Sequence, residues 1–199
     1  EVIEIIDGGG IVLAPSEIGY CFIGSVAHDS THEKFLKLRP GHPKNKPFSL
    51  FCKDISQVCK LAYLTTQTFR IATRAWPGPY TFILPCTKNT PKMAAGPKRK
   101  TVGIRISNHT IIQSIINEFD KPLLVTSITD DAELVAQDYF DENNNQDFWW
   151  TNVTDICEQA LPGIIDIAIK NDEIVPIKVS TIVDFSQEPP ELIRDGGWD

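Results

Sequence analysis

The sequence predicts a single α/β domain built on one twisted, mixed β-sheet that is flanked by helices. Short apolar runs typical of strands alternate with segments of helical periodicity, and the helices are too few for a regular doubly wound fold. With 199 residues, of which 42% are hydrophobic, the chain can bury one core without splitting into several domains. We therefore treat residues 1–199 as one domain.

Short apolar runs bounded by turn residues predict the strands of this sheet. The expected strands cover residues 11–14, 21–26, 48–52, 80–86, 101–106, 123–126, 164–169, 180–185 and 191–194. We expect Pro15 to close the first strand and residues 16–20 to form a polar turn before the second. No apolar run is long enough to cross a bilayer, so no membrane association is expected.

Capping residues and apolar spacing predict the helices. Asp54 can cap a helix that runs to residue 62, and residues 109–119 carry apolar side chains at i, i+3 and i+4. Further helices are expected over residues 2–6, 31–37, 66–75 and 152–161. Glycines 8–10 should end the first of these with a left-handed C-cap, and Thr31 should cap the second, with Phe35 and Leu38 turned inward.

Two segments lack a regular pattern. Residues 87–100 are rich in Pro, Gly, Asn and Lys and predict a loop. Residues 138–152 are acidic and Asn-rich, with an aromatic cluster at 148–150, and we interpret them as an irregular excursion that docks through its aromatics.

Composition limits the class of protein. A net charge of −7 and a pI near 5.1 argue against a protein that coats nucleic acid with its whole surface, although a local basic groove remains open. The five cysteines are scattered, form no CxxC pair and suit a reducing compartment rather than disulfides or a metal site. The N-terminal residues have no signal-peptide pattern, so we expect a cytoplasmic protein.

A cationic loop stands out in this acidic chain. Lys37, Arg39, Lys44 and Lys46 lie within ten residues that contain no acidic side chain and are broken by Pro and Gly. Held between a helix and a buried strand, such a loop could bind a multiply charged anion. The alternative is a solvated, flexible basic loop, and composition does not decide between the two.

Polar residues also gather where the expected strands end. Ser16 follows the first strand, Ser180 opens a late strand, and Arg194 closes the last. Residues 126–129 supply Thr126, Ser127 and Thr129 at another strand end. Such groups converge on the crevice where α/β proteins bind ligands, and hydroxyls with guanidinium groups suit a phosphate-bearing ligand.

Common catalytic signatures are absent from the sequence. There is no GxGxxG, Walker P-loop or nucleophile elbow. His28 and His32 are four residues apart but have no suitable third ligand, so a surface pair is favoured over a metal site.

The order of motifs along the chain resembles the YrdC/YciO-like family. Residues 9–20 resemble its glycine-rich opening "GGIV-x-x-P-T-(D/E)-x-x-Y", residues 37–40 its KxRP signature, and residues 46–50 the lysine-proline-strand that follows. Further matches are WPGP-x-T at 76–81, VG-x-R at 102–105, STVVD at 180–184 and the LR-x-G ending at 192–194. The KRKTVGIR segment ending at Arg105 is closer to the YciO branch.

This resemblance implies a YrdC/RibB-like fold around a large basic concavity and a specific reaction. Family members join L-threonine, bicarbonate and ATP with Mg²⁺ into threonylcarbamoyl-adenylate, which modifies adenosine 37 of certain tRNAs. By resemblance, Lys37 and Arg39 would be catalytic. ATP and the substrates would be bound by Ser16, Lys46, Ser49, Thr126, Ser127, Thr129, Ser180 and Arg194. No protein side chain is expected to ligate a metal.

The sequence departs from the family pattern at several points. Ser127-Ile128-Thr129 replaces Ser-Ala-Asn, so a planar amide is exchanged for a short hydroxyl, and Ile128 adds bulk. Losing such a partner costs on the order of 1–3 kcal/mol in a catalytic site. Ser16 replaces Thr, Lys170-Asn171-Asp172 replaces glycines, and residues 138–150 have no counterpart.

Three functions therefore remain open. The first is the threonylcarbamoyl-adenylate synthase or a variant that uses another amino acid, with RNA and a tRNA-modification protein as further partners. The second is a nucleotide- or double-stranded-RNA-binding paralogue with weak or no synthase activity, for which Lys98-Arg99-Lys100 would contact RNA unless it is a solvated loop end. The third is a carbamoyl-adenylate enzyme that acts on a different acceptor.

Overall fold

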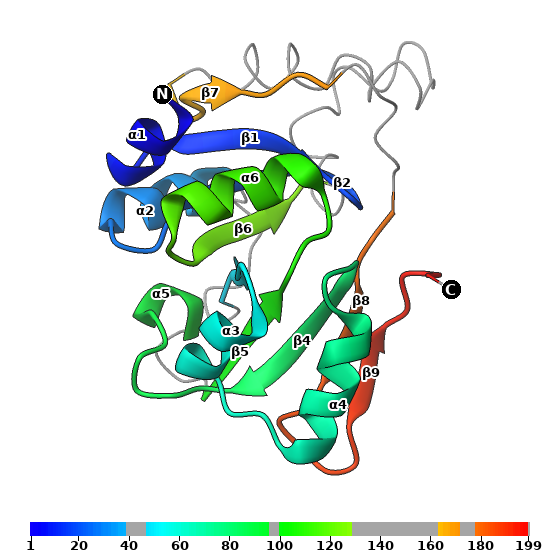
Figure 1. The fold of residues 1–199 in the computed structure, drawn as a ribbon. Coiled ribbons are helices and arrows are strands. Elements are labelled where there is room, and N and C mark those ends of the chain that lie inside the picture. The colour runs from blue at the N-terminus through cyan, green and yellow to red at the C-terminus, as the bar shows by residue number, and fades with distance from the viewer. Residues whose placement is uncertain (39–46, 96–99, 129–162, 172–177, 199) are drawn as a thin grey trace.

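A computed structural model describes residues 1–38, 47–95, 100–128, 163–171 and 178–198 (Figure 1). Its described strands form one sheet in the order β7-β1-β2-β6-β3-β5-β4-β8-β9. Their bounds are β1 Ile11–Ser16, β2 Gly19–Ser25, β3 Ser49–Phe51, β4 Tyr80–Pro85, β5 Thr101–Arg105, β6 Leu123–Ser127, β7 Ile167–Ala168, β8 Thr181–Asp184 and β9 Glu191–Arg194. The pairs β1/β7, β3/β5 and β4/β8 are parallel and the others antiparallel, so the predicted mixed sheet is confirmed.

Helices pack on both faces of the sheet. Their bounds are α1 Val2–Asp7, α2 Asp29–Leu38, α3 Ile55–Leu61, α4 Thr66–Ala75, α5 Lys92–Ala95 and α6 Thr110–Phe119. Asp54 caps α3 as predicted, because its Oδ1 accepts a hydrogen bond from the Gln57 backbone N–H at 2.7 Å. In Figure 1, α6 lies along β6 and beside β1, while α3, α4 and α5 lie next to β4 and β5.

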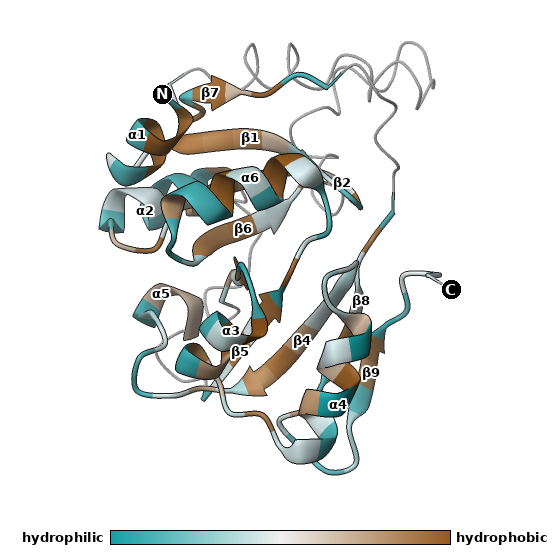
Figure 2. Cartoon of the chain, viewed as in Figure 1, coloured by the Kyte–Doolittle hydropathy of each residue, from teal (hydrophilic) through white to brown (hydrophobic). Residues whose placement is uncertain are grey.

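The alternation of side chains along the strands separates two cores. In β1, Ile11 and Leu13 belong to one cluster of buried residues, whereas Val12 and Ala14 belong to the other. The first cluster packs against α2, α3 and α4, and the second against α1 and α6. Figure 2 shows the matching pattern of hydrophobic strands and of helices that are hydrophobic on part of their surface only. We call the side of the sheet covered by α1 and α6 the α6 face.

The first strand extends further than predicted. β1 continues through Pro15 to Ser16, and Pro15 pairs with Tyr20. Backbone groups of Ile11 and Leu13 bond to the β7 side, so the missing N–H of Pro15 also points that way. Within the described residues β7 pairs with Val12 and Leu13 and not with Pro15, so Pro15 lies at an edge position where no donor is needed.

Other local predictions also need correction. Thr31 is not the cap of α2, because the helix begins two residues earlier and the buried Thr31 hydroxyl donates to the Gly9 carbonyl at 3.3 Å. The left-handed glycine after α1 is Gly9, with φ of 82°, and not the C-cap Gly8. Within the predicted 87–100 loop, α5 forms because Ala94 is fully buried against the first core.

Within the described residues, no helix has the length and apolar character needed to cross a membrane. The cysteines in this part of the chain are free thiols, of which Cys21 and Cys52 are buried. The predicted 138–152 excursion and 152–161 helix lie outside the described residues.

Candidate active site

Polar side chains from neighbouring strands share the α6 face of the sheet. Ser16 follows Val12 and Ala14 in the alternation of β1, and Ser127 pairs with Cys21, which belongs to the same core cluster. Arg105 pairs with Phe51, and Ser49 with Val125, both on this face. The strand ends thus bring serine hydroxyls and a guanidinium group to one side of the sheet.

The turn between β1 and β2 shapes one wall of the site. The Ser16 hydroxyl donates to the Gly19 carbonyl at 2.6 Å and accepts from the Ile18 backbone N–H at 3.5 Å. Gly19 has φ of 130°, a conformation that side chains rarely adopt. This local bonding fixes residues 16–19, which we call the hairpin tip, and directs Glu17 towards Arg105.

Glu17, Arg105 and Ser107 form a buried polar cluster beside Ser16. Arg105 is 4% exposed, its Nε lies 3.6 Å from Glu17 Oε1, and its guanidinium stacks 4.5 Å from the centre of the Phe51 ring. Ser107 donates to Glu17 Oε2 and accepts from the backbone N–H of His109, which precedes α6. No role was predicted for these three residues from the sequence. Arg105 could have been noticed, because it is a charged residue within the mostly apolar run 101–106.

The cluster leaves hydrogen-bonding capacity unused. Among the described residues, the Arg105 guanidinium has Glu17 as its ion-pair partner and makes no hydrogen bond, and Glu17 Oε1 is buried and accepts none. A buried arginine normally donates several hydrogen bonds, so this pair keeps unused hydrogen-bonding capacity that a polar ligand could satisfy. The geometry suits an anionic group on Arg105.

Cys21 lies next to this cluster but is not a nucleophile at neutral pH. Burial raises the pKa of its thiol to about 12, although the nearby Arg105 charge acts in the opposite direction. Its Sγ donates to the Ala14 carbonyl at 3.5 Å. The thiol therefore stays protonated and serves as packing.

A second polar cluster joins β4, β8 and β9. Arg194 Nε donates to the Ser180 carbonyl at 2.9 Å, its Nη2 lies 3.1 Å from Ser180 Oγ, and the Thr81 hydroxyl donates to the same Oγ at 3.0 Å. The Lys178 backbone N–H donates to the Ile18 carbonyl at 3.1 Å, so this cluster is tied to the hairpin tip. The structure thereby joins the predicted Ser180 and Arg194 directly and ties their cluster to the hairpin tip that holds Ser16.

Gly103 connects the two clusters across the sheet. A Cβ at this position would lie 2.9 Å from Ser49 Oγ and 3.7 Å from Thr81 Cγ2, so both side chains approach its bare face. Ser49 on β3 is thus on the α6 face, separated by β5 from Thr81 of the Ser180 cluster. A larger residue at position 103 would push the Ser49 hydroxyl away.

Other predicted site residues are placed differently. Thr126 pairs with Phe22 of the first core, so strand alternation buries it on the face opposite to Ser127. Lys37 is exposed on the last turn of α2, where Phe35 packs 5.2 Å from Phe48, the residue before Ser49. Lys37 therefore lies towards the end of the sheet where β3 starts. Arg39, Lys46 and Thr129 lie outside the described residues.

The bulk of Ile128 does not enter the site. Its side chain is 5% exposed and belongs to the first core cluster, and its backbone N–H donates to the Tyr20 carbonyl at 3.2 Å. The substitution of Ala by Ile in the family motif thus fills the core on the other side of the sheet.

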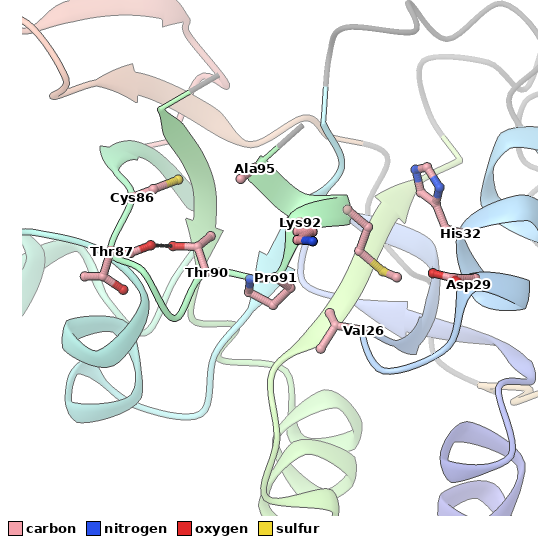
Figure 3. Close-up of a pocket in the computed structure, with 10 residues that line it drawn as sticks. Val26, Asp29, His32, Cys86, Thr87, Thr90, Pro91, Lys92 and Ala95 are labelled. Atoms are coloured by element: carbon pink, nitrogen blue, oxygen red, sulfur yellow. Dashed lines mark hydrogen bonds between the residues drawn. The ribbon is translucent and has the colours of Figure 1, made fainter. Parts of the chain in front are cut away.

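A separate cavity of about 740 Å³ lies at the opposite end of β2 (Figure 3). It is lined by Val26, Asp29 and His32 on one side and by residues 86–95, including Lys92 and Met93, on the other. None of the predicted site residues that the structure describes lines it, so it is distinct from the two polar clusters. In the part of the chain that the structure describes, no group of three or more His, Cys, Asp or Glu residues is placed to hold a metal.

The order of the motifs and the fold of the sheet are those expected of a known protein family. Residues 4–196 match the family of Sua5, YciO and YrdC, which is described as "Telomere recombination". The chain belongs to the Sua5/YciO/YrdC family. The predicted resemblance is therefore confirmed over nearly the whole chain.

Individual members of the Sua5/YciO/YrdC family match over different lengths. The uncharacterized protein YciO of Escherichia coli K12 is 26% identical over 199 residues, which cover 100% of this chain and 89% of that protein. A threonylcarbamoyl-AMP synthase of Vibrio vulnificus is 27% identical over 130 residues, or 64% of this chain and 69% of the relative.

Solved structures of this family share the fold. The crystal structure of E. coli YciO has a TM-score of 0.79 at 24% identity, covering 100% of this chain and 88% of that one. P. abyssi Sua5 complexed with L-threonine has a TM-score of 0.77 at 21% identity, covering 98% of this chain and 53% of that one. The predicted single-domain α/β fold is thus confirmed.

Proposed function

We propose that this protein adenylates the carbamate of an amino acid, with ATP and bicarbonate as co-substrates and pyrophosphate as a product. The observation that carries the proposal is the row of hydroxyls and guanidinium groups on one sheet face, from Ser16 and Arg105 to Ser180 and Arg194, tied together by the hairpin tip. The V. vulnificus relative named threonylcarbamoyl-AMP synthase supports this class of reaction.

The phosphates of ATP would lie along the hydroxyl row. Ser180 and Arg194 already form a hydrogen-bonded pair, so the guanidinium is held in position before ATP arrives. In the reaction a carbamate oxygen attacks the α-phosphorus, the P–O bond to the β-phosphate breaks, and pyrophosphate leaves. Fixed cations stabilise the charge that builds on the phosphates, and positioning replaces covalent catalysis.

The cationic loop would complete the phosphate site. Lys37 lies towards the end of the sheet where Ser49 starts β3, and Arg39 and Lys46 follow it in the sequence. We infer that ATP enters as its Mg²⁺ complex, in which Mg²⁺ neutralises part of the phosphate charge.

Arg105 would bind the carboxylate of the amino acid. It is a buried cation with unused donors, and a carboxylate matches its planar fork. The relative P. abyssi Sua5 has been solved in complex with L-threonine, which makes threonine the first amino acid to test. Transfer of the product to adenosine 37 of tRNA, with a partner protein, would follow in this proposal.

A nucleotide- or RNA-binding role without synthase activity is the second candidate. It is favoured by Thr129, which stands where the family motif has Asn, and by the basic residues 98–100. A protein of this kind would bind ATP or double-stranded RNA and release no pyrophosphate.

One assay separates the two candidates. The protein is incubated with ATP, Mg²⁺, bicarbonate and each amino acid in turn, and pyrophosphate and adenylate products are measured. The proposed function requires amino-acid-dependent product that a Lys37→Ala variant loses. If no amino acid gives more product than this variant, the synthase proposal is refuted, and salt-sensitive RNA binding would then support the second candidate.

A further inference from the structure

Glu17 presents a buried carboxylate oxygen, Oε1, that faces Arg105 Nε at 3.6 Å but accepts no hydrogen bond from any described group. Its side chain is 10% exposed, Oε2 accepts from Ser107, and Oε1 accepts no hydrogen bond although it is shielded from solvent. A carboxylate oxygen left in this state costs free energy, so its retention needs a reason.

The surroundings of Glu17 favour an incoming ammonium group. Arg105 on β5 is the cation at 3.6 Å, Cys21 on β2 is an uncharged thiol, and Ser107 precedes His109 at the start of α6. A substrate carboxylate on Arg105 would compensate the guanidinium charge and leave Glu17 facing the neighbouring α-ammonium. The pair thus matches both charges of an α-amino acid.

We propose that Glu17 is the base that removes a proton from the α-ammonium group of the amino acid before carbamate formation. This inference rests on the proposed function and goes beyond it, because it assigns the proton acceptor of the first chemical step. Cys21 is unsuited to this role, since its fully buried thiol holds its proton at neutral pH.

The step balances without a further reagent. The N–H bond of the ammonium breaks and its proton moves to Glu17 Oε1, which leaves a neutral amine. The amine lone pair then forms a C–N bond with the carbon of bicarbonate, the C–OH bond breaks, and the hydroxide leaves as water with the second amine proton. The products are the carbamate, water and protonated Glu17, which returns its proton to solvent.

Two variants and a control test the role of Glu17. Glu17→Gln keeps the size of the side chain and an acceptor for Ser107 but cannot take the proton. Glu17→Asp keeps the charge facing Arg105 and withdraws it by one methylene. Glu118→Gln, on the exposed side of α6, is the matched control. Folding is checked by circular dichroism and by ATP binding.

The readout is kcat and KM for amino-acid-dependent pyrophosphate release between pH 7 and 9. We expect kcat of Glu17→Gln to fall about 10²-fold at pH 7, in line with the usual effect of a general base. Below the pKa of the substrate amine, kcat of Glu17→Gln should then rise about tenfold per pH unit, because loss of the amine proton to solvent supplies the free amine. Glu17→Asp should lose activity while remaining folded, and Glu118→Gln should match the wild type.

Each result decides the question. A folded Glu17→Gln variant that matches the wild type at pH 7, or whose loss is independent of pH, overturns the role of Glu17 and leaves the proposed function intact. Glu17→Asp at full activity, with the pH profile of the wild type, also overturns it. If the wild-type protein releases no pyrophosphate with any amino acid, the proposed function fails and this assignment fails with it.

Discussion

Breaking the Glu17–Arg105 pair from one side should destabilise the protein more than removing both charges. At 3.6 Å and an effective dielectric constant of about 20, the attraction between the two charges is about 4–5 kcal/mol. We expect Arg105→Met to lower the free energy of unfolding by about 3–5 kcal/mol, because Glu17 is left buried and unpaired. Methionine keeps the apolar contact with the Phe51 ring.

The double variant Glu17→Gln, Arg105→Met isolates the pair. Because it buries no unpaired charge, its loss should be at least about 2 kcal/mol smaller than the sum of the two single losses. Urea unfolding followed by circular dichroism at pH 7 gives all four free energies. If the losses add to within about 0.5 kcal/mol, the two side chains are not coupled and the description of the cluster is wrong.

Three further predictions concern stability. Asp54→Ala should lower the free energy of unfolding in urea by about 1 kcal/mol, because it removes the cap of α3. A urea midpoint equal to that of the wild type would contradict the capping role of Asp54. Ile128→Ala should cost about 2–4 kcal/mol because the side chain fills the core, yet it should retain pyrophosphate release; a larger loss of activity than of stability would place Ile128 in the site. The raised pKa of Cys21, about 12 against 9.0 for a free thiol, predicts that its stabilising contribution is complete below pH 9 and is lost as pH rises towards 12, by about 1.4 kcal/mol per unit. The free energy of unfolding should therefore fall less steeply above pH 9 in Cys21→Ala than in the wild type. Equal slopes of unfolding free energy against pH in the two proteins would refute this.

The sequence predicted elements whose signals are local. The Asp54 cap and the helix α4 follow from capping and spacing, and they appear as expected. Pro15 was misjudged, because its tolerance depends on where β7 ends in a neighbouring part of the sheet. The extent of β1 thus depended on tertiary contacts.

The candidate site was only partly predictable for the same reason. Ser16, Ser180 and Arg194 were predicted from their positions at strand ends, and hydrogen bonds join Ser180 to Arg194 and Lys178 to the hairpin tip. Thr126 was included because strand ends were considered without the alternation of side chains that turns it away. Glu17 and Ser107 are 90 residues apart, and no local pattern indicates that they meet.

The hairpin tip makes the site dependent on folding of the whole chain. Residues 16–19 touch β5 through Glu17 and the C-terminal segment through the bond from Lys178 to Ile18. Contacts this distant in sequence form only after long loops have closed, which is entropically costly. A nascent chain that still lacks residues 178–198 would lack the Ser180–Arg194 cluster and its bond to the hairpin tip, so the candidate site is complete only once β8 and β9 have joined the sheet.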